Sequence, residues 1–527
     1  MVLAVTLRFS ALLLLEAPAA LAQQAPQAPT RQSSAYQELQ LFSGVLNQIR
    51  ANYVDSVTYR ELVRAAIDGM LHVLDPHSYF MPRADWEQRS ARERGELPGV
   101  GLELGQEDSA TTVLSVYPGS PAAKAGLEPG DRIATINDTA VAGLKLDDVS
   151  LRLAGPKGST LRIRIDRGSR LEPDTLSVTL TRAVLRAPPV TISGMVDSAT
   201  GYVRLIWFGL DAAHQLHDAV KRVKRQGARR LILDLRNNPG GVMDAAVDIA
   251  SDFFPSGTVV FRTKGRKPEE SHDFVTKRDG DFSDLPLIVL INGQSASAAE
   301  ALAGSLQDHD RALIAGRRSF GKALVQTGFL LVPSGDMVEL TVARVFTPNG
   351  RLIQRRYRGI GYVQYWSFAG KSGAAEDTLA LFKTDHGREV RGGGGIAPDV
   401  PLPAPAAVPV WWSVASDSGF DIAVADSVAQ QLPAGRAGLA EWLGDRPQWS
   451  RRLLAPLLER VHTRLGVLPH PDSALSDRLT LRLAARAATV RWPPDGGDEL
   501  VIRADPDIHA ALAYFSHLSA LLGAPVH

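Results

Sequence analysis

The chain has 527 residues, 45% of them hydrophobic, and this length predicts several domains with large buried cores. Its 58 lysine and arginine residues balance 57 aspartate and glutamate residues, so the charge gives no support for nucleic acid or an anionic membrane as a partner. The absence of cysteine excludes disulfides, cysteine nucleophiles and thiolate metal sites.

Residues 1–22 have the pattern of a secretory signal peptide. Arg8 precedes an apolar run over residues 9–15, and Ala20-Leu21-Ala22 offers a small-x-small cleavage site. The apolar run is too short to cross a bilayer, and no later segment reaches the ~20 residues that a membrane span requires. We therefore expect an exported protein, periplasmic or extracellular, with no membrane span; an uncleaved N-terminal anchor is the alternative.

A Pro/Gln/Ala linker at residues 23–35 precedes an expected N-terminal helical region, residues 36–95. Apolar residues recur there with helical spacing in two stripes, Leu39 to Ile49 and Leu62 to Leu74. The sequence Asp75-Pro76-His77-Ser78 then ends the second helix. Beside a helix-ending proline, His77 fits a turn or capping role better than the role of a ligand or a base.

Short strands and glycine turns characterise residues 96–183. Gly99-Val100-Gly101-Leu102 opens this region, and Gly119-Ser120-Pro121-Ala122 and Gly130-Asp131-Arg132-Ile133 follow, a succession that resembles a bacterial PDZ domain. A glycine-rich turn before a strand presents N–H donors that can hold a terminal carboxylate, and the strand edge can pair with an extended peptide. Gly99, Val100, Gly101 and Leu102 are therefore the candidate peptide-binding residues, facing a helix expected around Leu146 to Leu153. Taken alone, the glycines would mark only turns.

Residues 184–404 have the pattern of an α/β domain. Leu231 to Leu235 form a buried strand, which the turn Arg236-Asn237-Asn238-Pro239-Gly240-Gly241 connects to a helix beginning near Val242. A Pro-Gly-Gly turn at a strand end exposes backbone N–H groups that could stabilise an oxyanion. A simple tight turn explains the same residues equally well.

A serine and a lysine follow the next two apolar runs. Leu287 to Ile291 read as a buried strand, and Ser297 lies at the turn from this strand into a helix, near unpaired N–H groups and the positive helix end. Lys322 follows the apolar run 312–315, whose end should lie beside the end of the first strand. These positions suggest a serine nucleophile with a lysine base.

In this order, the motifs resemble those of the carboxy-terminal processing peptidases, the S41 family of Ser–Lys proteases. The resemblance covers roughly residues 36–403 and includes Tyr53-Val54-Asp55, Asp75-Pro76-His77-Ser78, the PDZ glycines, Asp234 to Gly241, Ser295 to Glu300, Phe320-Gly321-Lys322, Thr347 to Gly350 and Gly395 to Asp399. It implies a multidomain α+β protein with an N-terminal helical region, a PDZ-like β domain, an α/β serine protease core of the crotonase/ClpP type and a mainly helical C-terminal module.

The resemblance also implies site residues. The family's nucleophile falls on Ser297, its base on Lys322 and its lysine-orienting glutamine on Gln326, and the separations of 25 and 4 residues match the family's spacing. The oxyanion donors fall on the N–H of Ala298 and on the Pro-Gly-Gly turn, where the choice between Gly240 and Gly241 stays open. Ala299 and Ala323 stand where the family frequently has serine and glycine, and neither change removes a catalytic group.

The chemistry requires these residue types. A serine hydroxyl needs a neighbouring base, and a lysine must be desolvated to be neutral at working pH, because its ordinary pKa is ~10.4. The neighbours in sequence, Gly321, Ala323, Leu324 and Val325, would supply an uncharged setting for Lys322. Gln326 could then fix the lysine amine without adding a charge. The expected substrates are proteins or peptides with exposed C-termini.

Other polar residues receive less specific interpretations. Ser295 is expected to be a structural turn hydroxyl, and Glu300 to favour the first helical turn. His214 and His217 are expected to be surface residues, so we predict no metal and no cofactor. Ser319 to Lys322 formally matches an S-x-x-K motif, but no S-D-N element follows it before Lys371-Ser372-Gly373, and we discount this alternative.

The remaining segments carry no recognisable chemistry. Residues 355–392 look like an insertion into the last catalytic strands, and residues 405–527 form the helical C-terminal module, expected to serve packing, a homo-oligomer or an adaptor. A PDZ-bearing scaffold protein with a degenerate protease domain is the alternative class. Retention of Ser297, Lys322 and Gln326 together argues against it.

Overall fold

The structure, a computed structural model, describes residues 34–93, 96–107, 110–117, 119–128, 130–144, 146–167, 174–186, 188–367, 380–493 and 496–522. The chain divides into two compact units, residues 1–69 and 70–527. The expected signal peptide and the linker up to residue 33 lie outside the described residues. Within the described ranges, no helix combines the length and the apolar character needed to cross a bilayer.

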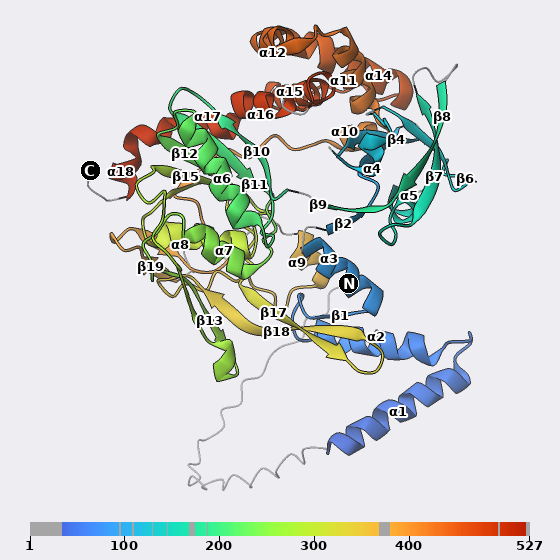
Figure 1. Ribbon diagram of the computed structural model, residues 1–527. Helices are drawn as coiled ribbons and strands as arrows, with labels where there is room; N and C mark the ends of the chain where they lie inside the picture. Colours follow the sequence, from blue (N-terminus) through green and yellow to red (C-terminus); the bar gives the residue numbers. More distant parts are fainter. Residues whose placement is uncertain are drawn as a thin grey trace, which may run out of the picture. The chain divides into compact units, whose positions relative to one another are not determined.

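The first unit contains α1 (Ala35–Asn52) and most of α2 (Tyr59–His72) (Figure 1). Ser34 and Gln37 form a reciprocal capping box that fixes the start of α1. The stripe expected from the sequence lies on this helix, yet α1 buries none of its residues, and Leu39 and Phe42 are 65% and 45% exposed.

Residues 102–181 form a small sheet with the strand order β3-β4-β5-β7-β8, and β6 pairs with β5. The strands are β3 (Leu102–Glu107), β4 (Ala110–Val116), β5 (Arg132–Ile136), β6 (Thr139–Ala140), β7 (Thr160–Arg167) and β8 (Asp174–Thr181), and the helices are α4 (Pro121–Lys124) and α5 (Leu146–Leu153). Strand β3 lies at the edge of the sheet, as the sequence predicts. A separate pair, β2 (Glu96–Gly99) with β9 (Ala183–Arg186), brings the two ends of this region together.

The central sheet has the order β10-β11-β12-β15-β16-β21. Its strands are β10 (Val190–Met195), β11 (Thr200–Leu205), β12 (Arg230–Asp234), β15 (Leu287–Ile291), β16 (Leu313–Gly316) and β21 (Val400–Pro401). All neighbours are parallel except β10 and β11. Strand β15 is buried throughout, because helices cover both faces, and this explains its unbroken apolar sequence.

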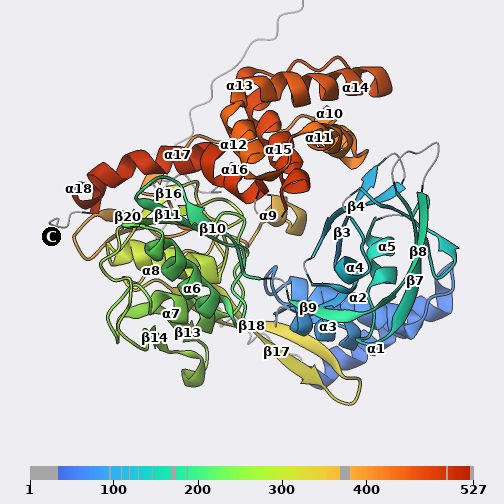
Figure 2. The same ribbon diagram turned by 45° about the horizontal axis from the view of Figure 1, so that its top comes forward.

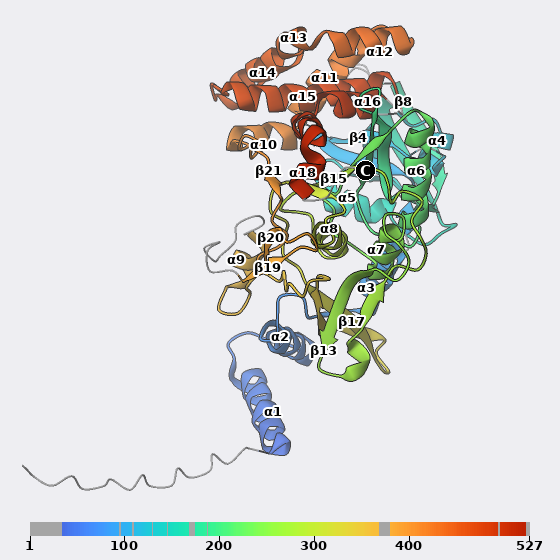
Figure 3. The ribbon, with the colours of Figure 1, turned by 90° about the vertical axis from the view of Figure 1, so that its left-hand side faces the viewer.

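Two helical layers cover the central sheet. On one face, α6 (Ala212–Arg225), α7 (Met243–Ala250) and α8 (Ala298–Asp308) pack against Leu233, Val289 and Ile314. On the other, α16 (Gly496–Ala504), α17 (Pro506–Leu512) and α18 (Leu518–Leu522) pack against Ile232, Leu290 and Leu313. Figures 2 and 3 show these red C-terminal helices on the opposite side of the sheet from the green α6.

A second sheet carries several residues of the candidate site. It has the order β1-β18-β13-β14, with β17 also paired to β18. Its strands are β1 (Tyr79–Met81), β13 (Val259–Gly265), β14 (Asp273–Val275), β17 (Leu324–Leu331) and β18 (Asp336–Phe346). The pairing of Tyr79 with Glu339 brings the turn after α2 next to the strand that follows Lys322.

The other elements are α3 (Arg83–Glu93), the single-turn η1 (Pro268–Glu270), α9 (Tyr362–Ser367), the hairpin β19 (Leu381–Lys383) and β20 (Glu389–Arg391), α10 (Val410–Asp417), α11 (Phe420–Gln431), α12 (Gly435–Gly444), α13 (Arg446–Trp449), η3 (Ser450–Leu454), α14 (Ala455–Leu465), α15 (Ser473–Arg491) and η4 (Ala513–His517). Helices α10 to α15 share a core that includes Trp412, Trp442 and Trp449.

Ion pairs anchor the C-terminal helices to the strand ends of the central sheet. Arg236, which follows β12, binds Asp505 at 3.0 Å and Asp507 at 2.8 Å at the start of α17. Asp507 also pairs with Arg317, which follows β16. Asp507 therefore holds both loops that flank the loop carrying Ser297, and Asp505 adds a second bond to one of them.

Candidate functional site

Three loops that carry the predicted site residues leave the carboxyl ends of parallel strands. Strands β12, β15 and β16 are neighbours, with Leu290 opposite Asp234 and Ile291 opposite Gly316. Because parallel strands end at one edge, the loops that follow them meet there, and such edges are the usual location of sites in α/β sheets. The expected adjacency of the two apolar strands is confirmed.

Ser297 occupies a tight turn between β15 and α8. Its φ of 56° and ψ of −117° lie in a sparsely populated region for a residue with a side chain, and such strain is often found at functional turns. The turn is held from outside by Ser295, whose buried hydroxyl donates to the Leu235 carbonyl at 2.7 Å, and by the Ala296 N–H, which donates to Asn238 O at 2.9 Å. Ser295 therefore has the structural role expected of it.

The two glycines of the Pro-Gly-Gly turn differ in their hydrogen bonds. The Gly240 N–H donates to Asn238 Oδ1 at 2.9 Å, whereas none of the described residues accepts a hydrogen bond from the N–H of Gly241 or of Ala298. Gly240 packs directly on the Ser297 turn: a Cβ there would lie 2.6 Å from Ala296 O and 2.9 Å from Ala298 N. Gly240 thus allows its turn to pack closely against the Ser297 turn, while the backbone N–H of Gly241 remains available as a hydrogen-bond donor.

Lys322 lies in a loop before β17 and lines a cavity of about 350 Å³. The residues around this cavity are His72, Pro76, His77, Ser78, Tyr79, Arg89, Lys322, Gln326, Glu339 and Trp366. Half of them come from the turn after α2 and from β17 and β18. The structure therefore brings Lys322 and Gln326 together, but Ser297 is not among the lining residues.

The electrostatic setting of Lys322 differs from the uncharged one that its sequence neighbours suggested. Burial lowers the pKa of Lys322, and the Arg89 guanidinium lowers it further, whereas Glu339 raises it. Arg89 and Glu339 form an ion pair at 3.1 Å. The expectation of an uncharged environment was wrong, because both charged groups come from elements distant in sequence.

Gln326 and His77 have defined partners in this cavity. Gln326 Nε2 donates to Thr341 Oγ1 at 3.2 Å. His77 is buried, its Nε2 lies 2.8 Å from Tyr365 Oη, and burial together with Lys322 lowers its pKa to about 4. The sequence indicated a turn role for His77 and gave no sign that it borders the lysine, because only the pairing of β1 with β18 brings the two together.

Glu300 joins the serine turn to the lysine loop. Its fully buried carboxylate accepts hydrogen bonds from the backbone N–H groups of Ser297, Gly321 and Lys322, and from the hydroxyl of Ser319. Burial raises the pKa of Glu300 to about 7, although these hydrogen bonds act in the opposite direction. The described residues show no hydrogen bond between the Ser297 hydroxyl and Lys322 Nζ. The two loops are joined by this carboxylate and by one backbone hydrogen bond, from Phe320 N to Ser295 O at 2.9 Å.

The four PDZ candidates lie together. Gly99, Val100, Gly101 and Leu102 line a cavity of about 170 Å³ whose other wall includes Ser150 and Leu153 of α5. Gly101 has a φ of 86°, and a Cβ there would lie 2.2 Å from the Ser120 Cβ, so this position requires glycine. A strand at the edge of a sheet, with a helix beside it, is the arrangement to which a peptide strand can be added.

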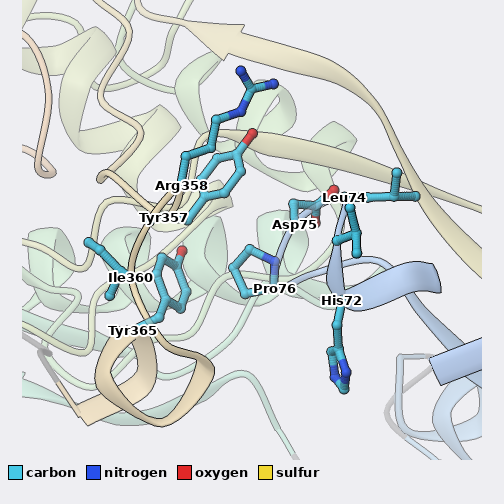
Figure 4. Close-up of a pocket in the computed structure, with 10 residues that line it drawn as sticks. His72, Leu74, Asp75, Pro76, Tyr357, Arg358, Ile360 and Tyr365 are labelled. Carbon is cyan, nitrogen blue, oxygen red and sulfur yellow. The ribbon is translucent and has the colours of Figure 1, made fainter. Parts of the chain in front are cut away.

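A further cavity of about 460 Å³ shares His72 and Pro76 with the lysine cavity. Figure 4 shows the turn around Asp75 and Pro76 on one side of it and Tyr357 and Tyr365 on the other. The contact between Tyr365 and His77 forms part of the boundary between the two cavities.

The helix α6 histidines differ from each other. His214 is exposed, as expected, but His217 is largely covered, and its Nδ1 lies 2.9 Å from Asp252 Oδ1. The prediction that both are surface residues was wrong for His217, because α6 presents it to Phe282. In the part of the chain that the structure describes, no group of three His, Cys, Asp or Glu side chains is arranged to hold a metal.

Comparison with known proteins identifies the family. The model for peptidase family S41 matches residues 199–362, a PDZ domain model matches residues 112–167, and a model described as the N-terminal domain of the activating protease CtpB matches residues 1–84. The carboxy-terminal-processing protease of Bartonella bacilliformis is 36% identical over 337 residues, which are 63% of this chain and 75% of that protein. The chain belongs to the carboxy-terminal processing proteases.

Two other known proteins are similar to this protease. The carboxyl-terminal-processing protease of a Synechocystis strain is 36% identical over 57% of this chain and 71% of its own length. The solved structure of a photosystem II D1 C-terminal processing protease is 29% identical and covers 69% of this chain and 93% of its own, with a TM-score of 0.37. The protein is thus a serine-type peptidase with a PDZ domain, and the family, the enzyme class and the PDZ domain predicted from the sequence are confirmed.

Proposed function

We propose that this protease cleaves peptide bonds with Ser297 as the nucleophile and Lys322 as the general base. The observation that carries the proposal is the pair of N–H groups beside Ser297, those of Ala298 and Gly241, for which the described residues hold no acceptor. Free donors at a strained serine turn suit the oxyanion that develops in acyl transfer. This favours Gly241 over Gly240 as the second donor.

In the proposed reaction, Ser297 Oγ attacks the peptide carbonyl carbon while Lys322 Nζ takes the hydroxyl proton. The Ala298 and Gly241 N–H groups stabilise the resulting oxyanion. Collapse of the tetrahedral species breaks the C–N bond as the Lys322 ammonium protonates the leaving amine, which leaves an acyl-enzyme. Water, deprotonated by Lys322, then attacks the ester carbonyl and releases the new C-terminus.

The surroundings of Lys322 support its role as a base. Burial and Arg89 lower its pKa, which raises the neutral fraction at working pH. The hydrogen bond to Ser297 would form with substrate, since catalytic hydrogen bonds in substrate-free enzymes are often long and tighten in the complex. Gln326, which lines the same cavity, would orient the amine after leaving Thr341.

Replacing Lys322 with methionine is expected to lower kcat/KM by roughly 10³-fold, the scale of a lost general base. In the unchanged protein, kcat/KM should rise with pH as Lys322 loses its proton, with the midpoint below the ordinary lysine pKa, because the pKa is lowered. The measurement is a pH–rate profile on an internally quenched peptide with an apolar C-terminus.

Two charge variants test the assignment of that midpoint to Lys322. Arg89→Met removes a cation that lowers the pKa of Lys322, so the midpoint should move to higher pH. Glu339→Gln removes an anion that raises this pKa, so the midpoint should move to lower pH. Shifts in the same direction, or none, would argue against Lys322 as the group that titrates.

We also propose that the PDZ groove captures the substrate's C-terminal tail. The tail would add a strand to the edge of β3, its carboxylate would meet the N–H groups of the Gly99-to-Leu102 turn, and its last apolar side chain would enter the cavity beside α5. The PDZ domain of this protease and the position of that cavity support this reading.

Amidation of the substrate's C-terminus should raise KM by about 10-fold, because a charge-assisted hydrogen bond contributes about 1.5–3 kcal/mol. The comparison uses free-acid and amidated forms of one substrate. Leu102→Asp in the groove should abolish the difference, whereas Leu151→Asp, on α5 but 65% exposed, should preserve it. Equal KM values for the two substrates would count against tail capture.

The proposal extends to organisation and location. Residues 36–95 would be the N-terminal helical region, residues 96–183 the PDZ domain, and residues 184–404 a core of the crotonase/ClpP type with the insertion near 355–392. The parallel central sheet supports this type of core. Residues 405–527 would supply packing and contacts with an adaptor or a second copy. The signal-like segment at residues 1–22 supports export.

A further inference from the structure

Glu300 is a buried carboxylate with every acceptor position in use. Its Oε2 accepts from Ser297 N at 2.9 Å and from Lys322 N at 2.8 Å. Its Oε1 accepts from Gly321 N at 2.7 Å and from the Ser319 hydroxyl. Burying a carboxylate is unfavourable unless hydrogen bonds compensate the lost water, and these four donors supply that compensation.

A single oxygen atom thus binds the main chains of the nucleophile and of the base. The Lys322 loop, residues 317–323, contains no regular secondary structure, and Glu300 is its connection to the first turn of α8. On the other side, the hydrogen bond to Ser297 N holds a residue whose backbone is strained. Movement of either loop would break one of these two bonds.

We propose that Glu300 is a positioning residue for peptide cleavage, which fixes the separation between the Ser297 turn and the Lys322 loop through their backbone N–H groups. The inference rests on the proposed roles of Ser297 and Lys322 and adds the element that aligns them. Glu300 contacts no reacting atom in this arrangement. It acts through the main chain, before and during each cycle.

A capping role alone does not account for these contacts. A helix cap requires only the bond from Ser297 N, three residues before Glu300, which is the capping-box pattern. The other three bonds reach across to residues 319–322, outside the helix. A role as a general acid is also excluded by geometry, because both oxygen atoms face backbone and hydroxyl donors in the interior.

The test is Glu300→Gln, which preserves size but presents one acceptor oxygen and an NH₂ group that faces N–H donors. We expect kcat to fall by about 100-fold with KM within about 2-fold of the unchanged protein, since a displacement of about 1 Å of a catalytic group has this effect. Glu300→Asp, which keeps both oxygen atoms at a shorter reach, should have an intermediate kcat. If Glu300→Gln does not fold, the kcat of Glu300→Asp tests the positioning role.

Gln307→Leu provides the matched structural control. Gln307 is also buried on α8, but its side chain binds Ala397, Asp399 and Arg351, away from the serine turn. This variant should lower Tm and keep kcat, whereas Glu300→Gln should lower kcat beyond any loss that its own Tm explains. A folded Glu300 variant with unchanged kcat overturns the positioning role.

Ser297→Ala in the same assay distinguishes a failure of the positioning role of Glu300 from a failure of the proposed mechanism. If Ser297→Ala is inactive and Glu300→Gln is fully active, only the positioning inference fails. If Ser297→Ala remains active, the proposed mechanism fails, and the inference that rests on it fails with it.

Discussion

Replacing Ser297 with alanine is expected to lower kcat/KM for peptide cleavage by roughly 10⁴- to 10⁶-fold, the range found when the nucleophile of a serine protease is removed. The reason is specific to the hydroxyl, because the backbone of the turn is held by Glu300 and by the Ala296 N–H. Tm should therefore change little. The assay is cleavage of an unfolded protein with an apolar C-terminus, with product masses read by mass spectrometry.

Ser305→Ala is the control for this substitution. Ser305 is buried on the same helix, α8, and has no proposed contact with substrate, so its variant should keep kcat/KM within about 3-fold, as expected of a small change away from the reacting groups. Substantial cleavage by the Ser297 variant would favour the scaffold alternative with contaminating protease activity, or another nucleophile.

Gly240→Ala is also expected to have a large effect, a loss of about 10²- to 10³-fold in kcat, comparable to the loss of an oxyanion donor. A Cβ at this position would lie 2.8 Å from the Ser297 Cβ and 2.9 Å from Ala298 N. The Pro-Gly-Gly turn must therefore move away from Ser297, and Gly241, the next residue, would move with it. The measurement is kcat together with Tm.

Gly257→Ala distinguishes this displacement from backbone strain. Gly257 has a φ of 82°, close to the 93° of Gly240, but a Cβ there would meet nothing within 4 Å. Both variants should lose about 1 kcal/mol of stability from the unfavourable φ, and only Gly240→Ala should lose activity. Equal kcat values for the two variants would contradict the proposed contact between Gly240 and the serine turn.

The parts of the fold that could be predicted from the sequence are those fixed by local patterns. Leu287 to Ile291 and Ala312 to Ala315 are unbroken apolar runs, which suit strands buried on both faces, and they do pair in parallel. The Ser297 turn followed from the small polar residues between such a strand and a helix start. The edge position of β3 followed from the PDZ pattern.

Contacts between distant segments could not be predicted in this way. The charged groups near Lys322 come from α3 and β18, whereas its sequence neighbours are uncharged. A prediction from the neighbours alone therefore gave the wrong electrostatic environment for Lys322. Glu300 has the capping-box spacing from Ser297, but nothing in that spacing shows that its carboxylate also binds residues 319–322. Nor does the sequence show that the Asn238 side chain accepts a hydrogen bond from the Gly240 N–H.

The layer formed by α16 to α18 has a consequence for how the protease is made. These helices cover Ile232, Leu290 and Leu313 on one face of the central sheet, and they begin about 180 residues after β16 ends. At ~5–20 residues per second, a ribosome needs roughly 10–35 s to add that length, during which the apolar face has no cover. Ser297 and Lys322 are already synthesised by then, yet the ion pairs from Asp505 and Asp507 to the neighbouring loops cannot form. The packing of this face and the ion pairs to the loops after β12 and β16 are therefore completed only once the C-terminal helices have been made.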